Sequence, residues 1–429
     1  MGCRPVAQLI VRRDGSVLRR DREVVSEIAV DPIRAIVRFL EGTPPGALPW
    51  TVGFLAYDLA PYVETCMRLA RDPGDGTPLA YLARYDALLV GQCPAGPDGP
   101  ADDPLLRWRV QAESRAAAER LVADLGDPRD CEGDSAPAYR GELIEAPARA
   151  RHEEGVRRAL ELIAAGDVYQ VNLAGRFRVA SSQPPDRAYA AMRSRQPVPH
   201  GAFLDTGDFA VLVNSPERFL RLSGDAVETR PIKGTRPRGE TPAADRALVR
   251  GLLCDPKERA EHVMIVDLER NDLGRVCRPG SVAVSSFLEV ESFATLHHLV
   301  STVRGRLRPD AGLEELLRAT FPGGSITGAP KIRAMEVIAE LEAQPRGIYT
   351  GAFVRCRGPR DLDSAIAIRV AVARDGVFTY HAGGGIVADS DPAREYDECL
   401  LKAAPFLGAT LTRTELVRHD GGSAWPADR

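Results

Sequence analysis

Apolar residues recur along the second half of the chain with two different periods. Val156, Leu160 and Ile163 fall on one helical face, and Gly166 stands where a C-cap would end that helix. Residues 169–173 then alternate between apolar and polar, as a strand does. The pattern therefore predicts a helix followed directly by a strand.

The same patterning predicts many strands and fewer helices over the rest of this part. We expect strands over residues 209–214, 219–222, 281–290, 301–307, 349–356, 364–372 and 377–382. We expect helices over residues 246–254, 256–272, 313–319, 330–341 and 392–407. Long runs of neighbouring strands broken by helices predict an α+β fold with large, mainly antiparallel sheets.

The N-terminal part is less clearly patterned. Residues 51–64 and 80–90 look like strands with turns, and two segments rich in Gly, Pro and Asp, 91–104 and 126–147, look like joints. We predict three units: an N-terminal part over residues 1–145 that contributes to the sheets, a catalytic domain over 146–412, and a tail over 413–429.

Composition narrows the classes of partner. The 429 residues carry a net charge of only −4, with basic and acidic residues interspersed, so no global field points to nucleic acid or to a membrane surface. The eight cysteines form no CxxC pair, and no apolar run reaches the ~18 residues of a membrane span. We expect a soluble, cytoplasmic protein with reduced thiols. Because the net charge is small, any binding of an anion must depend on a local cluster of cationic or N–H groups.

Lys233 lies between a proline turn and a glycine, with Arg230, Arg236 and Arg238 close in sequence. A lysine held among cations has reason to lose its proton and become a nucleophile. An electrostatic contact with an anionic substrate is the alternative role for this amine.

Two pairs of glutamates share one helical spacing. Glu258 and Glu261 stand at i,i+3 on one predicted helix, and Glu395 and Glu398 repeat that spacing on another. If the two faces meet, they form a hard oxygen site suited to Mg²⁺ with water and an anionic substrate. The alternative is that both pairs are solvated helix surface.

Two glycine-rich segments are candidates for binding an anion. Gly383, Gly384 and Gly385 lie between a strand and an acidic helix, where backbone N–H groups could hold a carboxylate; a plain turn is the alternative. Residues 321–331 resemble a phosphate loop, but Ala329 stands where that loop requires lysine. We reject a nucleotide site and predict a Gly/Ser/Thr turn at a helix N-terminus that binds an anion.

Arg369 stands in the apolar predicted strand 365–372. It must face solvent or find a buried carboxylate. His297 and His298 precede another predicted strand, and histidines in such places are more often core residues than catalysts.

Taken together, these segments resemble the chorismate-utilising enzymes, the family of anthranilate synthase component I, aminodeoxychorismate synthase component I, isochorismate synthase and salicylate synthase. The resemblance is dense over residues 145–410 and weaker before, chiefly in GFLAYDL (53–59). The matching motifs are SPERFL (215–220), RPIKGTRPRG (230–239), AEHVMIVDLERNDLGRV (260–276), HHLVSTVRG (297–305), FPGGSITGAPKIRAME (321–336), IYTGAF (348–353), AIAIR (365–369) and AGGGIVADSDPAREYDE (382–398).

The resemblance implies a fold and a set of roles. It implies a two-layer, mainly antiparallel β-sandwich with helices outside and a site in the cleft between the sheets. It implies Mg²⁺ bridging chorismate to Glu261 and Glu398, with Glu258 and Glu395 close by. Glu217 would be the general acid, and His298 would lie near the ring as a third catalytic residue beside Glu217 and Lys233. Substrate contacts would come from Gln170, Thr235, Ser325, Thr327, Tyr349, Arg369, Gly383, Gly384, Gly385 and Lys402.

Two positions separate the members of the family. Water-adding members have a lysine base where this chain has Gln170, and glutamine cannot take a proton from water at neutral pH. Among nitrogen-adding members, aminodeoxychorismate synthase resembles the PIKGT of residues 231–235, whereas anthranilate synthase typically has alanine at position 233. The resemblance thus implies amination of chorismate through a Lys233 nucleophile, for 4-aminobenzoate and folate synthesis.

The resemblance also implies an ammonia source. These 429 residues contain no nucleophile-elbow cysteine flanked by glycines, so a separate glutamine amidotransferase subunit is expected to deliver ammonia. Anthranilate synthase component I and a catalytically decayed chorismate-binding subunit are the alternatives.

Overall fold

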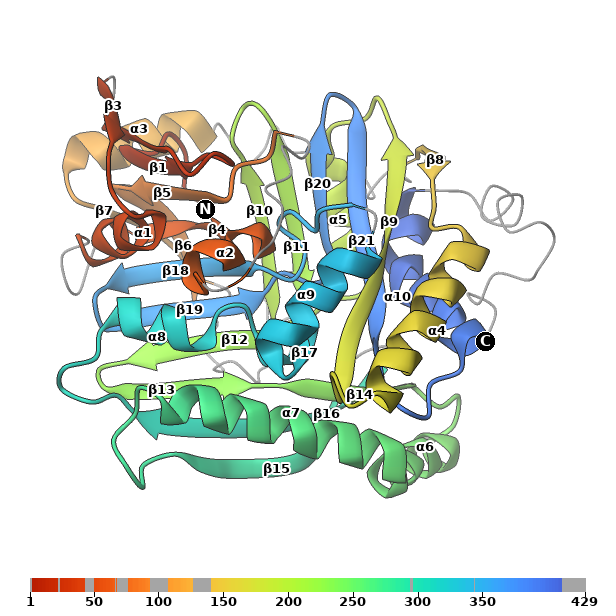
Figure 1. Ribbon diagram of the computed structural model, residues 1–429. Coiled ribbons are helices and arrows are strands. Elements are labelled where there is room, and N and C mark those ends of the chain that lie inside the picture. The colour runs from red at the N-terminus through yellow and green to blue at the C-terminus, as the bar shows by residue number, and fades with distance from the viewer. Residues whose placement is uncertain are drawn as a thin grey trace.

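Two large antiparallel sheets dominate the computed structural model, and each is covered by helices on its outer side (Figure 1). The structure describes residues 2–21, 24–42, 50–65, 67, 76–92, 107–125, 140–293, 296–342 and 344–410. Within these ranges every paired strand runs antiparallel to its neighbour. The tail over residues 413–429 and most of both predicted joints lie outside the described residues.

The larger sheet has twelve described strands. Their order is β14 (Ile232–Pro237), β16 (Leu296–Arg306), β13 (Ala226–Arg230), β12 (Arg218–Ser223), β19 (Asp361–Ile366), β18 (Ala352–Gly358), β4 (Trp50–Leu55), β5 (Ala80–Tyr85), β1 (Ala7–Val11), β2 (Val17–Asp21) and β3 (Val24–Ile28), with β15 (Ala283–Ser292) also pairing with β16. Strands from the N-terminal part therefore extend the sheet that carries Lys233, although the predicted boundary at residue 145 stays a prediction.

The smaller sheet has seven described strands. Their order is β10 (His200–Asp205), β11 (Ala210–Ser215), β20 (Val370–Arg374), β21 (Val377–Ile386), β9 (Gln170–Ala180) and β17 (Gly328–Ala329), with β8 (Glu142–Glu145) also pairing with β9. A separate hairpin joins β6 (Ala87–Gln92) and β7 (Arg107–Ala112).

Apolar side chains from both sheets form the core between them. Phe54 of β4 packs edge-on against Phe209, with ring centroids 6.1 Å apart, and Tyr81 of β5 joins the same cluster as Val211 and Val213 of β11. Burial of this surface from both sides stabilises the face-to-face packing. The predicted α+β, two-layer antiparallel sandwich is confirmed.

Helices cover the outer faces. The described helical segments are α1 (Pro32–Glu41), η1 (Tyr57–Leu59), α2 (Ala60–Val63), α3 (Arg115–Leu125), α4 (Arg149–Ala164), α5 (Pro185–Arg195), α6 (Pro242–Cys254), α7 (Pro256–Gly274), α8 (Leu313–Thr320), η3 (Gly324–Ile326), α9 (Lys331–Leu341) and α10 (Pro392–Thr410). Ile33 of α1, Val266 of α7 and Leu316 of α8 share one core cluster on the larger sheet. On the smaller sheet, Phe406 of α10 stacks on Tyr380 of β21 with centroids 4.6 Å apart. None of the helices that the structure describes is both long and apolar enough to cross a membrane.

The structure corrects several predicted elements. The strand expected over 364–372 is broken into β19 and β20, because Arg369 adopts a positive φ of 49° that strand pairing does not accommodate. Residues 57–63, expected within a strand-and-turn segment, are helical, and the predicted joint over 126–147 ends in β8. His297 and His298 lie inside β16 rather than before a strand. The strand expected from residue 349 begins only at Ala352, because residues 347–350 form turns.

Candidate active site

Lys233 is presented by a bulge in β14. In the pairing with β16, Lys233 lies opposite Leu299 and Thr235 lies opposite His298, so Gly234 is left over. Gly234 has a φ of 72°, and a Cβ there would lie 2.9 Å from Leu252 and 3.1 Å from Glu258. Only glycine meets both demands, and the bulge re-aims the neighbouring lysine.

The surroundings of the Lys233 amine favour its neutral form. Burial lowers the pKa of Lys233; Glu261, Glu217 and Glu398 oppose that shift, and the ammonium of Lys402 adds to it. Lys233 forms no ion pair with any described residue. An amine with a lowered pKa and no ion-pair partner is available as a nucleophile.

Glu217 lies between β11 and β12 and is only 4% exposed. Ser325 Oγ donates a hydrogen bond of 2.6 Å to Glu217 Oε1. Burial raises the pKa of Glu217 to about 7, although Ser325 and Lys233 both lower it. A carboxyl group that is partly protonated at neutral pH can act as a general acid.

Three further predicted residues leave polar atoms unpaired within the described part of the chain. Both amide atoms of Gln170 on β9, Nε2 of His298 and Nη1 of Arg369 are buried and lack a hydrogen-bond partner there. Thr235 Oγ1 lies 3.0 Å from His298 Nδ1. Since buried polar groups normally have hydrogen-bond partners, these atoms are candidates for binding a polar ligand.

The charges of His298 and Arg369 are unusual for these residue types. Burial, reinforced by Arg369, lowers the pKa of His298 to about 4, so its ring is neutral at pH 7. His298 can then accept or donate a hydrogen bond but is poorly suited to transfer protons near pH 7. Arg369 has no ion-pair partner among the described residues, so it does not find the buried carboxylate considered from sequence.

Gly383, Gly384 and Gly385 form part of a strand rather than a turn. They pair with Ala174, Leu173 and Asn172 of β9. A Cβ at Gly384 would lie 3.1 Å from Glu395 Oε2, and one at Gly385 would lie 3.0 Å from Gln170 Nε2 and 3.3 Å from Lys233 Nζ. Gly384 thus leaves room beside Glu395, and Gly385 leaves room beside Gln170 and Lys233.

The two glutamate pairs converge from α7 and α10. Asp255 caps α7 by accepting from the backbone N–H groups of Lys257 and Glu258, which places the first pair in the opening turns. Lys257 Nζ lies 3.8 Å from Glu261 Oε1 and 3.9 Å from Glu395 Oε1, so one ammonium sits between the helices. The two helix faces therefore meet, which is the condition that the sequence analysis set for an oxygen site.

Each glutamate also has its own partner. Arg236 pairs with Glu258 at 3.0 Å, Ser390 donates to Glu395 at 2.6 Å, and Lys402 pairs with Glu398 at 2.6 Å. Burial raises the pKa of both Glu261 and Glu395, whereas Lys402 lowers that of Glu398. Among the described residues, no three His, Cys, Asp or Glu side chains lie close enough together to hold a metal ion. Carboxylate oxygens are ligands that suit Mg²⁺. In this structure the ammonium of Lys257 lies beside the carboxylates of Glu261 and Glu395 and balances part of their negative charge.

The remaining predicted residues support the site in other ways. Thr327 donates its hydroxyl hydrogen bond to the Gly323 and Gly324 carbonyls, 2.9 and 3.3 Å away, so it shapes its own loop. Lys402 donates to the Gly383 carbonyl at 2.9 Å. The Tyr349 ring is buried and stacks on His381. The loop is followed by β17 before α9 begins at Lys331, so the predicted anion turn does not open directly into a helix.

Sequence reasoning missed Arg346, Lys257 and Glu269. Lys257 stands four residues before Glu261, a spacing that was visible in the sequence. Glu269 follows Ile265 by four positions on the buried face of α7, which also gave a signal. Arg346 stands four residues after Glu342, but its bonds to Ile326 and Asn172 join segments far apart in the chain, so its place in the site gave no sequence signal.

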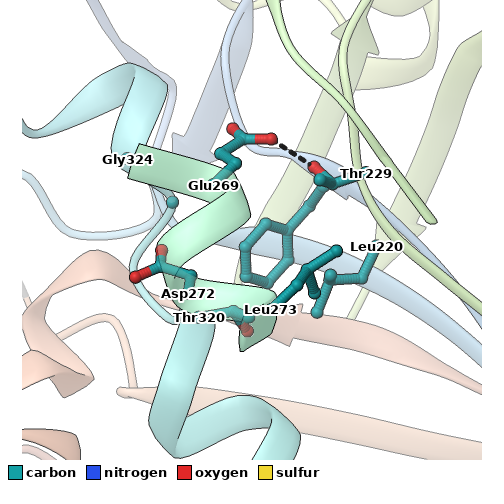
Figure 2. Close-up of a pocket in the computed structure, with 9 residues that line it drawn as sticks. Leu220, Thr229, Glu269, Asp272, Leu273, Thr320 and Gly324 are labelled. Atoms are coloured by element: carbon teal, nitrogen blue, oxygen red, sulfur yellow. Dashed lines mark hydrogen bonds between the residues drawn. The ribbon is translucent and has the colours of Figure 1, made fainter. Parts of the chain in front are cut away.

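Glu269 lines a small cavity behind the loop that carries Ser325 (Figure 2). Thr229 Oγ1 donates to Glu269 Oε2 at 2.7 Å, and burial raises the pKa of Glu269 to about 8. The nearby Glu217 contributes to that shift. A second buried acid therefore lies close to the candidate general acid.

Known proteins match this chain over most of its length. A family model described as chorismate binding enzyme matches residues 5–408. An aminodeoxychorismate synthase of Streptomyces griseus is 48% identical over 309 residues, covering 70% of this chain but 42% of that protein. An aminodeoxychorismate synthase component 1 of Bacillus subtilis is 38% identical over 358 residues, covering 82% of this chain and 75% of that one. This chain thus spans about two fifths of the first relative and three quarters of the second.

A solved structure shares the fold over almost the whole chain. Anthranilate synthase component I from Streptococcus pneumoniae superimposes with a TM-score of 0.80 at 30% identity, covering 95% of this chain and 91% of that one. The chain belongs to the family of chorismate binding enzymes.

Proposed function

We propose that this chain converts chorismate and ammonia to 4-amino-4-deoxychorismate, as component I of an aminodeoxychorismate synthase. The observation that carries the proposal is the Lys233 amine, which has a lowered pKa and no ion-pair partner among the described residues, in the same site as Glu217. The two relatives described above bear the same name.

Substrate binding would use the unpaired cations of the site. Chorismate carries two carboxylates, and Arg369 offers a buried guanidinium without a carboxylate partner in the described region. Gln170 and His298 offer unpaired hydrogen-bonding atoms, and the glycines of β21 leave room for the ring. We propose that Tyr349 and Lys402 complete the carboxylate contacts.

Mg²⁺ is proposed as the cofactor, held by Glu261 and Glu398 with Glu258 and Glu395 close by. When bound, it would supply positive charge to the ring carboxylate of the substrate. Lys257 lies between Glu261 and Glu395, so its ammonium must yield to the ion.

The first chemical step is a covalent substitution. Lys233 Nζ attacks the ring carbon that is next to the ether-bearing carbon and carries no hydroxyl, the two conjugated ring double bonds shift, and the ring C–O bond to the hydroxyl breaks. Protonated Glu217 gives its proton to that hydroxyl, which departs as water. A secondary ammonium then links Lys233 to the ring.

The second step reverses the first with a new nucleophile. Ammonia attacks the carbon from which the hydroxyl departed, the two ring double bonds shift back, and Lys233 leaves as a neutral amine. Glu217 recovers its proton from the new ammonium, so chorismate and ammonia yield product and water with the enzyme unchanged. We propose that a glutamine amidotransferase subunit supplies the ammonia, that the product feeds 4-aminobenzoate and folate synthesis, and that the site of action is the cytoplasm.

The product separates this function from its nearest alternative. Purified protein is incubated with chorismate, Mg²⁺ and ammonium, and aminodeoxychorismate lyase is added. The products are separated by chromatography and identified by mass spectrometry. 4-Aminobenzoate that forms only when the lyase is present supports the proposal. Anthranilate from the unmodified chain would make anthranilate synthase component I the correct assignment, and unconsumed chorismate would indicate a decayed subunit.

A further inference from the structure

Arg346 is buried where three site-bearing segments meet. Its side chain is 1% exposed. Nη1 donates to the Ile326 carbonyl at 3.0 Å and to Thr350 Oγ1 at 3.1 Å, and Nη2 donates to the Asn172 carbonyl at 2.8 Å. One guanidinium thus joins the loop at Ser325, strand β9 and the turn after Tyr349.

A bidentate ion pair neutralises this buried charge. Arg346 Nε and Nη2 contact the two carboxylate oxygens of Glu342 at 2.9 and 2.7 Å. Glu342 Oε1 also accepts from the backbone N–H of Ala174 on β9 at 2.9 Å. The pair is therefore tied to the strand that carries Gln170, and Arg346 has little freedom to move.

The N-terminal part holds Arg346 from the opposite side. The Tyr57 ring lies under the guanidinium, with Arg346 Cζ 4.8 Å from the ring centroid. Tyr57 N–H donates to the Gly347 carbonyl at 2.8 Å, and Gly347 N–H donates to Asp58 Oδ2 at 3.1 Å. Tyr57 and Asp58 thus contact the Arg346 side chain and both backbone polar groups of Gly347, and so hold the turn that begins at Arg346.

Arg346 holds the loop at Ile326, the residue next to Ser325, which contacts Glu217. Ile326 lies between Ser325, which donates to Glu217, and Thr327, whose carbonyl accepts from the Asn172 N–H at 2.8 Å. Arg346 and Asn172 therefore hold the loop at adjacent peptides. A loop freed from Arg346 would no longer fix the Ser325 hydroxyl at 2.6 Å from the carboxyl group.

We propose that Arg346, held by Tyr57, is a positioning residue that clamps the Ser325 loop so that Ser325 stays bonded to Glu217. The proposal rests on the proposed function only where turnover is measured. It makes the N-terminal part a support of the catalytic loop, although that part supplies none of the predicted site residues.

The test follows protonation of Glu217 directly and needs no turnover. Infrared difference spectra against Glu217→Gln report the carboxyl band of Glu217 as pH is varied. The charged groups that face Glu217 are Lys233, Lys402 and Glu269, and all three are kept. Ser325→Ala removes a bond to the ionised form and should move the titration to higher pH by about one unit.

Arg346→Lys keeps the charge but cannot reach Ile326, Asn172 and Glu342 together. We expect the same direction and a similar size of shift, and no further shift when Arg346→Lys is added to Ser325→Ala. Arg318→Lys is the matched control, because Arg318 likewise joins carboxylate and backbone carbonyl groups, those of Asp31, Glu314 and Tyr62, but on the outer helix α8. Its Glu217 titration should equal that of the unmodified chain.

A second pair of variants covers the case in which Arg346→Lys does not fold. Tyr57→Leu removes the ring under the guanidinium, and Tyr57→Phe keeps it while removing a hydroxyl without a partner in the described region. The leucine variant should shift the titration upward and the phenylalanine variant should not. A Glu217 titration unchanged in both Arg346→Lys and Tyr57→Leu would overturn the proposal, whichever product the enzyme makes from chorismate.

Discussion

Ser325 and Glu217 are 108 positions apart in the chain, yet the serine hydroxyl donates a hydrogen bond of 2.6 Å to the glutamate. The contact joins the loop between α8 and α9 to the connection between β11 and β12. It holds a buried carboxyl group in a fixed orientation and lowers a pKa that burial has raised to about 7.

The first prediction concerns the pH profile of this carboxyl group. Because Glu217 must be protonated to act as a general acid, kcat/KM should fall as pH rises through about 7. Glu217→Gln should lose about 10²- to 10⁴-fold in kcat/KM and should lack this limb. Chorismate consumption followed from pH 5.5 to 9 measures both, and a profile in Glu217→Gln identical to that of the unmodified chain would refute the role.

The second prediction concerns the open space at Gly385. An added Cβ would lie 3.0 Å from Gln170 Nε2 and 3.3 Å from Lys233 Nζ, so Gly385→Ala displaces both groups. We expect a loss of about 100-fold in kcat/KM, since small misplacements at a reacting centre have effects of that size. Thermal unfolding should change little.

Gly251→Ala is the control for that variant. Gly251 lies in α6, where a Cβ would meet nothing within 4 Å. Alanine there should leave activity unchanged and stabilise the fold by about 0.5–1 kcal/mol. Equal activity in the two alanine variants would show that the space at Gly385 is not used by substrate.

Much of the fold and part of the site follow from the sequence, for a physical reason. Strand and helix periods reflect burial, so the two sheets and the helices near residues 256, 313 and 392 could be predicted. Helical spacing predicted that each glutamate pair shares one helix face, but not that the two faces converge. The pairing of Glu217 with Ser325 was not predicted, because no local pattern reports a contact across 108 positions.

The failures also have physical causes. Glycine disfavours strands, so residues 383–385 look like a turn, although pairing with β9 keeps them extended. The positive φ of Arg369 breaks an apolar run that otherwise reads as one strand. The Arg346–Glu342 spacing is local, but the role of Arg346 is not visible from sequence, because its bonds reach Asn172, 174 positions away, and its stacking partner lies in the N-terminal part.

The third prediction concerns Lys257 and the cofactor. Its ammonium lies near Glu261 and Glu395, so it should compete with Mg²⁺ for the site. Because Lys257 is 44% exposed, its effect is screened, and Lys257→Ala should tighten Mg²⁺ binding about fivefold. Isothermal titration calorimetry without chorismate gives the dissociation constant.

Two controls accompany the Mg²⁺ titration. Arg270→Ala removes a cation from the same helix, where it pairs with Asp267, and should leave Mg²⁺ affinity unchanged. Glu261→Gln should weaken binding, because it removes a proposed ligand. Weaker Mg²⁺ binding in Lys257→Ala would contradict the idea that this ammonium occupies the place of the ion.

The fourth prediction concerns stability at alkaline pH. The folded-state pKa of Glu269 is raised from 4.5 to about 8, so the native state holds this proton more tightly than the unfolded chain does. The free energy of unfolding should therefore fall as pH rises from 4.5 through 8. Glu269→Gln keeps an acceptor for Thr229 and should remove that part of the loss.

Urea unfolding at pH 6 and pH 9 measures this effect. The glutamine variant should be more stable than the unmodified chain at pH 9 and should differ less from it at pH 6. Glu154→Gln, at a side chain 73% exposed, is the control and should not change the pH dependence. A pH dependence unchanged in Glu269→Gln would mean that Glu269 ionises normally in the fold.

The central claim is that Lys233 forms a covalent bond to the substrate ring, and intact-protein mass spectrometry tests it most directly. The protein is mixed with chorismate and Mg²⁺ without ammonia, and the reaction is quenched. The mass of the intact protein is measured, and the modified residue is located by peptide digestion and mass spectrometry. The account predicts an added mass equal to chorismate less one water, located on Lys233 and released when ammonium is supplied, and no such mass in Lys233→Ala. Formation of 4-amino-4-deoxychorismate by Lys233→Ala at the unmodified rate, with no adduct on the unmodified chain, would contradict it.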